Sequence, residues 1–132
     1  MKKRKDVTYE LVKYAINTKY ESLPSCVVEK TKMLILDTLG CCIAGSSAVG
    51  VKEIVELLNK WDGERESTIL VYGYRAPAPS AAFANSVMTH ARDLEDTQDV
   101  AVIHCTTPIL PAALAIAESE NASNTVCISI LL

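Results

Sequence analysis

Hydrophobic residues recur along most of this chain at the three- and four-residue spacing of an amphipathic helix. The clearest case is the segment 51–61, whose apolar face is formed by Val51, Ile54, Val55, Leu58 and Trp61. Gly63 follows as the expected C-cap. The pattern predicts a helix that packs one face against a core and leaves the other face to solvent.

Two further helices are predicted before this segment. The first spans about 6–17, with Asp6 or Thr8 as its N-cap. The second opens after Pro24, spans about 25–44 and ends at Gly45. Its middle, residues 33–36, is apolar on every side, which indicates a central helix that is buried on several sides.

Two more helices are predicted in the second half of the chain. One spans about 81–93 with Ser80 as its N-cap. The other begins at Thr106 or Thr107 and runs to about Glu118. We place Pro108 and Pro111 in its first turn, where backbone N–H groups have no partner within the helix.

One short segment, 67–72, does not follow the helical pattern. It is rich in β-branched and aromatic residues, so we expect a short strand or an extended segment there. The fold class is therefore predicted to be all-α, with at most one short extended segment near 67–72.

Length and charge exclude several classes of protein. The 132 residues allow one domain at most, and 49% hydrophobic residues are enough for a core. A net charge of −3 does not provide the excess of positive charge that is typical of nucleic-acid-binding domains. The basic start is not followed by an apolar signal region, and no apolar run is long enough to span a membrane. We therefore expect a cytoplasmic protein without a nucleic-acid or membrane partner.

The five cysteines do not indicate a disulfide framework or a structural metal site. Their number is odd, Cys41 and Cys42 are adjacent, and no Cys-x-x-Cys pair is present. Most of them are expected to be small buried apolar residues.

Candidate chemistry is concentrated in residues 90–107, which carry both histidines of the chain. If the helix at 81–93 continued, Ser86, His90, Asp93 and Thr97 would form one polar stripe on it. His104 lies just before a helix N-terminus, where free N–H groups favour an anion. His104 and Asp93 are thus candidates for dividing the roles of acid and base around a small carboxylate.

The carboxylate would rest on Thr106 and Thr107, with His90 as a third substrate-binding residue. Two other interpretations stay open. Acid-rich segments at helix ends are often only solvated caps. Alternatively, His90, Asp93, Asp96 and His104 are a possible ligand set for a divalent ion, as in a metal-dependent hydrolase.

Three ordered motifs resemble the MmgE/PrpD family, which includes 2-methylcitrate dehydratase, cis-aconitate decarboxylase and iminodisuccinate epimerase. The motifs are Leu36-Asp-Thr-Leu-Gly40 with Ala44-Gly45, Ala81-Ala-Phe-Ala-Asn85 with His90-Ala-Arg-Asp-Leu-Glu-Asp-Thr97, and His104 with the proline–alanine segment 108–118. Three departures from the family pattern are visible: Ser86 in place of glycine, Glu95 in place of aspartate, and Cys105-Thr106 in place of proline–serine.

The resemblance implies that Asp93, Thr97 and His104 are catalytic. It also implies metal-independent lyase chemistry on a small di- or tricarboxylate, either dehydration or decarboxylation, without a cofactor. Epimerisation of a similar substrate is a lesser alternative.

The resemblance further implies that residues 1–132 are the N-terminal portion of a larger helical domain. A second α/β lid domain and substrate-binding lysines would then lie beyond residue 132, and the full-length protein would be a homodimer. The apolar run 126–132 is consistent with such a truncation. A second hypothesis, from a different class, is a catalytically inactive helical remnant or association module.

Overall fold

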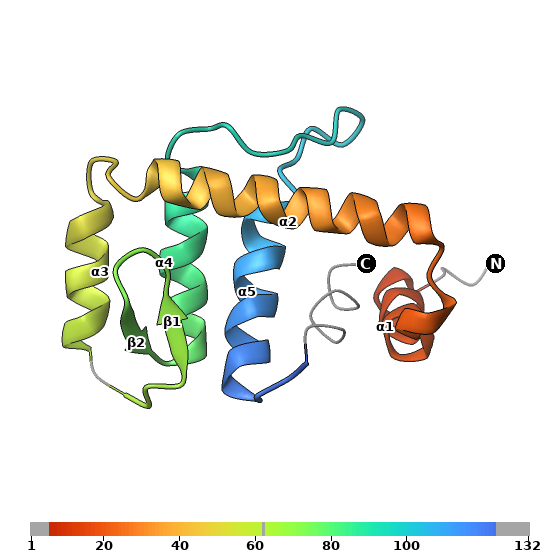
Figure 1. Ribbon diagram of the computed structural model, residues 1–132, viewed down its shortest axis with the longest axis horizontal. Coiled ribbons are helices and arrows are strands. Elements are labelled where there is room, and N and C mark those ends of the chain that lie inside the picture. The colour runs from red at the N-terminus through yellow and green to blue at the C-terminus, as the bar shows by residue number, and fades with distance from the viewer. Residues whose placement is uncertain (1–5, 62, 124–132) are drawn as a thin grey trace.

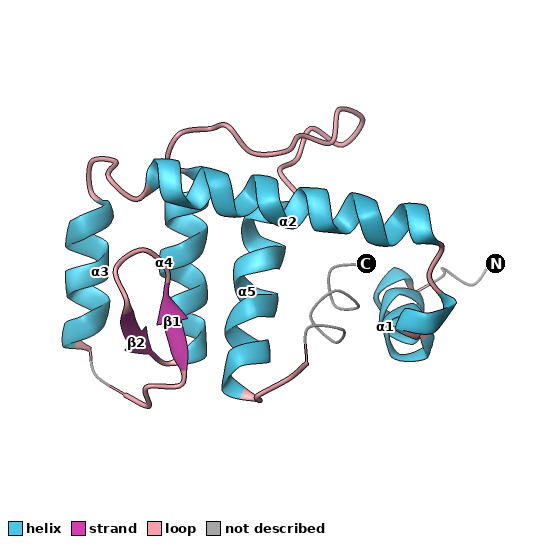
Figure 2. Cartoon of the chain, viewed as in Figure 1, coloured by secondary structure: helices cyan, strands magenta, loops and turns pink. Residues whose placement is uncertain are grey.

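The computed structural model describes residues 6–61 and 63–123 and is mostly helical (Figures 1 and 2). The helices are α1 (Val7–Asn17), α2 (Ser25–Gly45), α3 (Val51–Lys60), α4 (Ala78–His90) and α5 (Thr106–Ser119), with a short 3-10 turn, η1 (Tyr20–Ser22), after α1. Strands β1 (Ser67–Ile69) and β2 (Tyr74–Ala76) pair in an antiparallel hairpin. The all-α prediction with a short extended segment is confirmed, although β2 was not predicted. The apolar run 126–132 lies outside the described residues.

Helix α2 crosses the top of the molecule in Figure 1, and α3, α4 and α5 descend from it side by side. Helix α4 contacts α2, α3, α5 and both strands, so it is the centre of the fold. Its alanines Ala81 and Ala84 are fully buried, and their small side chains allow the neighbouring elements to approach closely. The core consists of Cys42, Val51, Val55, Leu58, Ile69, Ala76, Ala78, Ala81, Ala84, Met88 and Ala115.

The hairpin is held against α4 and α5 by side-chain hydrogen bonds. Asn85 on α4 accepts from the backbone N–H of Leu70 at 2.8 Å and donates to the carbonyl of Thr68 at 3.0 Å. From β1, the hydroxyl of Ser67 donates to the carbonyl of Ala115 at 2.6 Å. Polar groups of a short hairpin that would otherwise be buried without partners are thereby satisfied.

The prediction that the middle of α2 is buried on several sides is wrong for the described residues. Met33 and Leu36 are 64% and 74% exposed. Only one side of the helix faces α4 and α5, and that side carries the buried residues Thr31 and Thr38. An apolar sequence cannot report how many neighbours a helix has, so the pattern overstated the burial.

The N-terminal helix boundaries agree with the predictions. The carboxylate of Asp6 accepts from the N–H of Tyr9 at 3.2 Å and caps α1. Helix α2 follows Pro24 and ends at Gly45, as expected. Helix α3 buries Val51, Val55 and Leu58, but Trp61 is its C-cap and is 67% exposed, so Gly63 lies beyond the cap.

Proline positions account for two differences in the later helices. Helix α4 begins at Ala78 rather than Ala81, because Pro79 is tolerated in the first turn and Glu66 accepts from the N–H of Ala78 at 3.0 Å. In α5, only Pro108 lies in the first turn. Pro111 lies inside the helix, where it removes one backbone hydrogen bond.

None of the helices within residues 6–61 and 63–123 has the length and apolarity needed to cross a membrane. In the same part of the chain, Cys26, Cys41, Cys42 and Cys105 are free thiols, and Cys41 and Cys42 are buried.

Candidate acid–base site at the start of α5

The segment between α4 and α5 reverses direction directly after α4. The helix ends at His90 rather than Asp93, and Asp93 adopts the left-handed conformation with φ = 54°. Aspartate tolerates this conformation better than most residues. The predicted polar stripe over Ser86, His90, Asp93 and Thr97 therefore does not form, because Asp93 and Thr97 lie in the loop.

A closed loop then returns the chain to the end of α4. The N–H of Gln98 donates to the carbonyl of Ile103 at 2.8 Å, and the side chain of Gln98 accepts from the N–H of Ala101. Because residues 98 and 103 are joined, His104 lies beside residues that precede it by about ten positions. The rings of His90 and His104 have their centroids 5.3 Å apart.

Glu95 lies at the centre of this arrangement. Its side chain is fully buried, and Oε1 accepts hydrogen bonds from Nδ1 of His90 and from the hydroxyl of Thr107, the latter at 3.1 Å. Nδ1 of His104 is 3.8 Å from the same oxygen. One carboxylate thus links the end of α4, the loop and the start of α5.

The tautomer of neutral His104 follows from its hydrogen bond. Nδ1 is 3.0 Å from the backbone carbonyl oxygen of Asp96, and a carbonyl can only accept, so Nδ1 carries the proton. Nε2 is then left with a lone pair, and it is 3.6 Å from Oδ1 of Asp93. An imidazole in this state is ready to accept a proton at Nε2.

The contact between His90 and Glu95 shifts both groups towards their charged forms. Hydrogen bonding and then Coulombic attraction from Glu95 raise the pKa of His90 above its ordinary value. Burial alone would raise the pKa of Glu95, but hydrogen bonds from His90, its own backbone and Thr107 outweigh the burial and lower this pKa overall. Both shifts therefore favour a partly buried ion pair between the two residues.

The N-terminus of α5, expected to bind a substrate carboxylate, is occupied by a carboxylate of the protein itself. Oδ1 of Asp96 accepts from the N–H of Thr106 at 3.1 Å and also from the hydroxyl of Thr106. Thr107 donates its hydroxyl to Glu95. A substrate would have to displace these acids to use Thr106 or Thr107, so the two threonines organise the site in the described state.

Asp93 and Thr97 are both exposed, and the side chain of Asp93 is 77% accessible. Asp93 faces Nε2 of His104, whereas Thr97 has no hydrogen-bond partner among the described residues. The structure thus brings His104, Asp93 and His90 together and leaves Thr97 beside them on the loop.

Three of the described side chains are close enough to share a metal ion. Ligand atoms of His90, Asp93 and Glu95 lie within 4.8 Å of one another. Asp96, one of the four metal ligands considered from the sequence, instead caps α5. In this arrangement Nδ1 of His90 and Oε1 of Glu95 are hydrogen-bonded to each other, so a metal ion bound through these two atoms would have to displace the proton between them.

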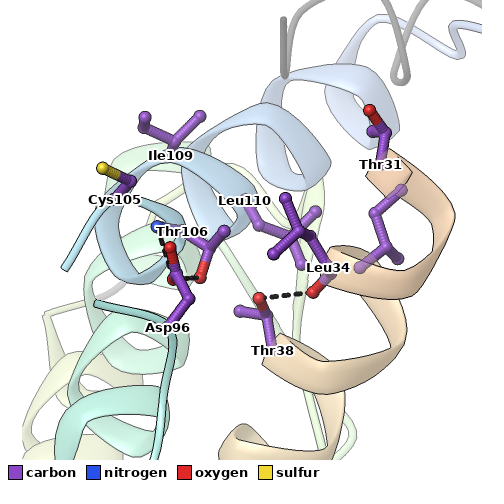
Figure 3. Close-up of a pocket in the computed structure, with 9 residues that line it drawn as sticks. Thr31, Leu34, Thr38, Asp96, Cys105, Thr106, Ile109 and Leu110 are labelled. Carbon is purple, nitrogen blue, oxygen red and sulfur yellow. Dashed lines mark hydrogen bonds between the residues drawn. The ribbon is translucent and has the colours of Figure 1, made fainter. Parts of the chain in front are cut away.

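A cavity of about 110 Å³ lies between α2 and the first turns of α5 (Figure 3). Its walls are mainly apolar, with Leu34 and Ile35 on one side and Ile109 and Leu110 on the other. The one charged side chain in its lining is Asp96. A negatively charged, apolar cavity is unsuited to an anionic substrate, so the open surface beside His104 is the better candidate site.

Glu95 is the site residue that sequence reasoning missed. The sequence shows it as one acid among several in an acid-rich turn, and its neighbour Leu94 is the expected buried residue. In the structure, Leu94 is 64% exposed and Glu95 is 6% exposed. One signal in the sequence could have identified Glu95 as a site residue: it stands at a motif position where the family has aspartate.

Comparison with known proteins shows the family of this chain. The family model for the MmgE/PrpD N-terminal domain matches residues 9–131. Cis-aconitate decarboxylase of Aspergillus terreus is 30% identical over 112 residues, which cover 85% of this chain and 23% of that protein. The human cis-aconitate decarboxylase is 30% identical over 120 residues, and the cis-aconitate decarboxylase-like protein oryM of Aspergillus oryzae is 27% identical over 116 residues. These cover 87% and 88% of this chain, and 24% of each relative.

The described residues form a helical domain that presents two histidines and a buried carboxylate at a helix start. The chain belongs to the MmgE/PrpD family. It spans about a quarter of the length of the curated relatives that it matches.

Proposed function

We propose that this chain supplies the acid–base part of a lyase active site that acts on a small di- or tricarboxylate without a metal ion. The observation that carries the proposal is the state of His104. Its Nδ1 proton is held by the carbonyl of Asp96, so Nε2 has a free lone pair beside Asp93. Membership of the MmgE/PrpD family supports this assignment, as do relatives named cis-aconitate decarboxylase.

In this mechanism, His104 Nε2 is the group that moves the proton. In a dehydration, Nε2 takes the proton from the carbon next to a carboxylate, and the C–O bond on the neighbouring carbon breaks as the imidazolium returns that proton to the hydroxyl, which leaves as water. In a decarboxylation, carbon dioxide leaves and the protonated imidazole gives its proton to the carbon that carried the carboxylate. Asp93 orients the imidazole from 3.6 Å, and the exposed Thr97 is a hydrogen-bonding residue for the substrate.

The remaining parts of the proposal concern the whole enzyme. Residues 1–132 are proposed to be the N-terminal portion of the helical domain, with the lid domain and further substrate-binding groups supplied from elsewhere in a homodimeric protein. His90, whose protonated form is favoured by the hydrogen bond to Glu95, is proposed to supply a positive charge for the substrate carboxylates. The complete site needs more cationic groups than the described loop offers.

The test is turnover of the protein encoded by the whole reading frame with cis-aconitate, citrate and 2-methylcitrate, followed by NMR in deuterated water. Exchange or transfer of a proton at the substrate carbon, lost in His104→Ala and retained in His104→Ala with added imidazole, supports the proposal. Unchanged turnover in His104→Ala contradicts it. Inversion at carbon without loss of water or carbon dioxide identifies an epimerase of the same family.

A second candidate function is an association module without catalysis. The exposed apolar residues Met33, Leu36 and Ile43 on α2 favour it, because such residues are commonly covered by another protein surface. Light scattering of the purified chain distinguishes the candidates when combined with the turnover assay. A stable oligomer with no turnover and no substrate binding supports the module.

A further inference from the structure

The side chain of Glu95 is fully buried, yet only one of its oxygens is satisfied. Oε1 accepts from His90 and Thr107, whereas Oε2 has no hydrogen-bond partner among the described residues. A buried carboxylate with an unpaired oxygen costs free energy of folding. This cost offsets part of the stabilisation that Oε1 gains from His90 and Thr107.

We infer that Glu95 is a positioning residue, whose buried carboxylate fixes the ring of His90 through its Nδ1–H and places a negative charge beside the ring of His104. The inference rests on the proposed function, since it states how the acid–base role of His104 is prepared. It concerns a residue that the motif-based assignment of Asp93, Thr97 and His104 leaves out.

The first step of the argument is the geometry at His104. Its Nδ1 proton lies between two acceptors, the carbonyl of Asp96 at 3.0 Å and Oε1 of Glu95 at 3.8 Å. The hydrogen bond to Asp96 fixes the proton on Nδ1, and the more distant Glu95 adds its negative charge on the same side of the ring. When Nε2 accepts a proton, the ring becomes positive, and the charge of Glu95 stabilises it at short range.

The second step concerns His90, on the other side of the carboxylate. Its Nδ1 donates to Oε1 of Glu95, and the side chain remains 56% exposed. His90 therefore presents a positive charge at the surface where a carboxylate substrate would approach His104. A neutral residue at position 95 would remove the charge that favours the protonated form of His90, whereas Nδ1 of His104 would keep its bond to the carbonyl of Asp96.

The other charged groups around the pair are few. Asp93 faces Nε2 of His104, Asp96 caps α5, and the Nε of Arg92 donates to the carbonyl of Ala44 on α2 at 3.5 Å. From α2, the buried thiol of Cys41 faces the loop. Its pKa is raised by burial first and then by the charges of Asp37, Glu95 and Asp96. Within residues 6–61 and 63–123, Glu95 is the one charged group that lies within 4 Å of His90, His104 and Thr107 together.

The experiment is histidine NMR of the 132-residue chain labelled with ¹⁵N, which needs no turnover. Two-bond ¹H–¹⁵N correlations identify which ring nitrogen carries the proton, and a pH series gives the pKa of His90. In the wild type, His104 is expected to be protonated on Nδ1, and His90 is expected to titrate above its ordinary range. In Glu95→Gln, the pKa of His90 is expected to fall towards its ordinary value, and the ring signals of His104 are expected to move because the nearby charge is lost.

Glu64→Gln is the matched control, because Glu64 is exposed and its substitution removes the same charge. It is expected to leave both histidines unchanged. A folded Glu95→Gln protein with unchanged histidine signals overturns the inference, and so does a wild type in which His104 is protonated on Nε2. If Glu95→Gln does not fold, the same pH series is measured on Glu95→Asp. A pKa of His90 that stays raised in this variant supports a role for the charge at position 95. A pKa of His90 at its ordinary value overturns the inference. If the histidine signals are as expected but the turnover assay shows no reaction, the proposed function is contradicted and the inference about Glu95 is not.

Discussion

The carboxylate of Asp96 caps helix α5 from outside the helix, by accepting hydrogen bonds from both the N–H and the hydroxyl of Thr106. The N-cap residue itself, Cys105, makes no side-chain cap. Asp96 is ten residues before Thr106 along the chain, so this bond closes the loop that carries His104. The hydrogen bonds that cap α5 therefore also hold the loop of the candidate site in place.

Asp96→Ala is expected to destabilise the protein by about 1 kcal/mol or more, because the N–H of Thr106 loses its acceptor and α5 loses a negative charge at its N-terminus. Urea denaturation followed by circular dichroism measures the change. Asp99→Ala, at an exposed position in the same loop, is the control and should have little effect. Equal stability of the two variants would show that the cap contributes nothing.

The close contact between α2 and α4 predicts a severe effect of one methyl group. A Cβ on Gly45 would lie 1.8 Å from the carbonyl oxygen of Met88, which is backbone and cannot rotate away. Gly45→Ala is therefore expected to push the two helices apart and to cost at least about 2 kcal/mol of unfolding free energy. Thermal denaturation monitored by circular dichroism measures the loss.

Gly40→Ala provides the control on the same helix. A Cβ on Gly40 meets no atom within 4 Å, so this change should stabilise α2 by up to about 1 kcal/mol through helix propensity. The two substitutions add the same atoms and should have opposite signs. A similar response of both variants would contradict the close approach at Gly45.

The sequence pattern predicts elements well where one helix face decides the structure. Helix α3 is the best case, because Val51, Val55 and Leu58 were expected to be buried and are buried. The pattern fails at Met33 and Leu36, since hydrophobicity reports what a side chain prefers and not how many neighbours surround it.

In the candidate site, too, some residues could be predicted from the sequence and others could not. The cluster in residues 90–107 and the pairing of Asp93 with His104 could be expected from motifs. The burial of Glu95 and the capping by Asp96 could not, because both depend on the left-handed turn at Asp93 and on the loop closed between Gln98 and Ile103. Long-range hydrogen bonds of this kind leave no periodic signal in a sequence.

Asn85 is predicted to be essential for the hairpin, because its amide satisfies the N–H of Leu70 and the carbonyl of Thr68 at the same time. Asn85→Ala leaves both groups without partners in a mostly buried setting, and the expected cost is about 2 kcal/mol or more. Chemical denaturation gives this value. Asn59→Ala, on the exposed side of α3, is the matched control and should have little effect; a loss as large as that of Asn85→Ala would argue against the bridge.

The pair formed by His90 and Glu95 predicts how stability depends on pH. The pKa of Glu95 is lowered from its ordinary 4.5, so its contribution is complete above 4.5 and is lost as the pH falls through the lowered value. The pKa of His90 is raised from its ordinary 6.5, so its contribution is complete below 6.5 and is lost as the pH rises through the raised value. The pair therefore stabilises the fold most between pH 4.5 and 6.5.

Subtracting the melting temperature of His90→Gln from that of the wild type, over a series of pH values, isolates this contribution. The difference should be greatest between pH 4.5 and 6.5 and should shrink on both sides, as Glu95 gains a proton below and His90 loses one above. Since His90 is half exposed, high salt should reduce the difference but not abolish it. A difference that stays constant across the series would mean that the contact stabilises the fold through packing and not through charge.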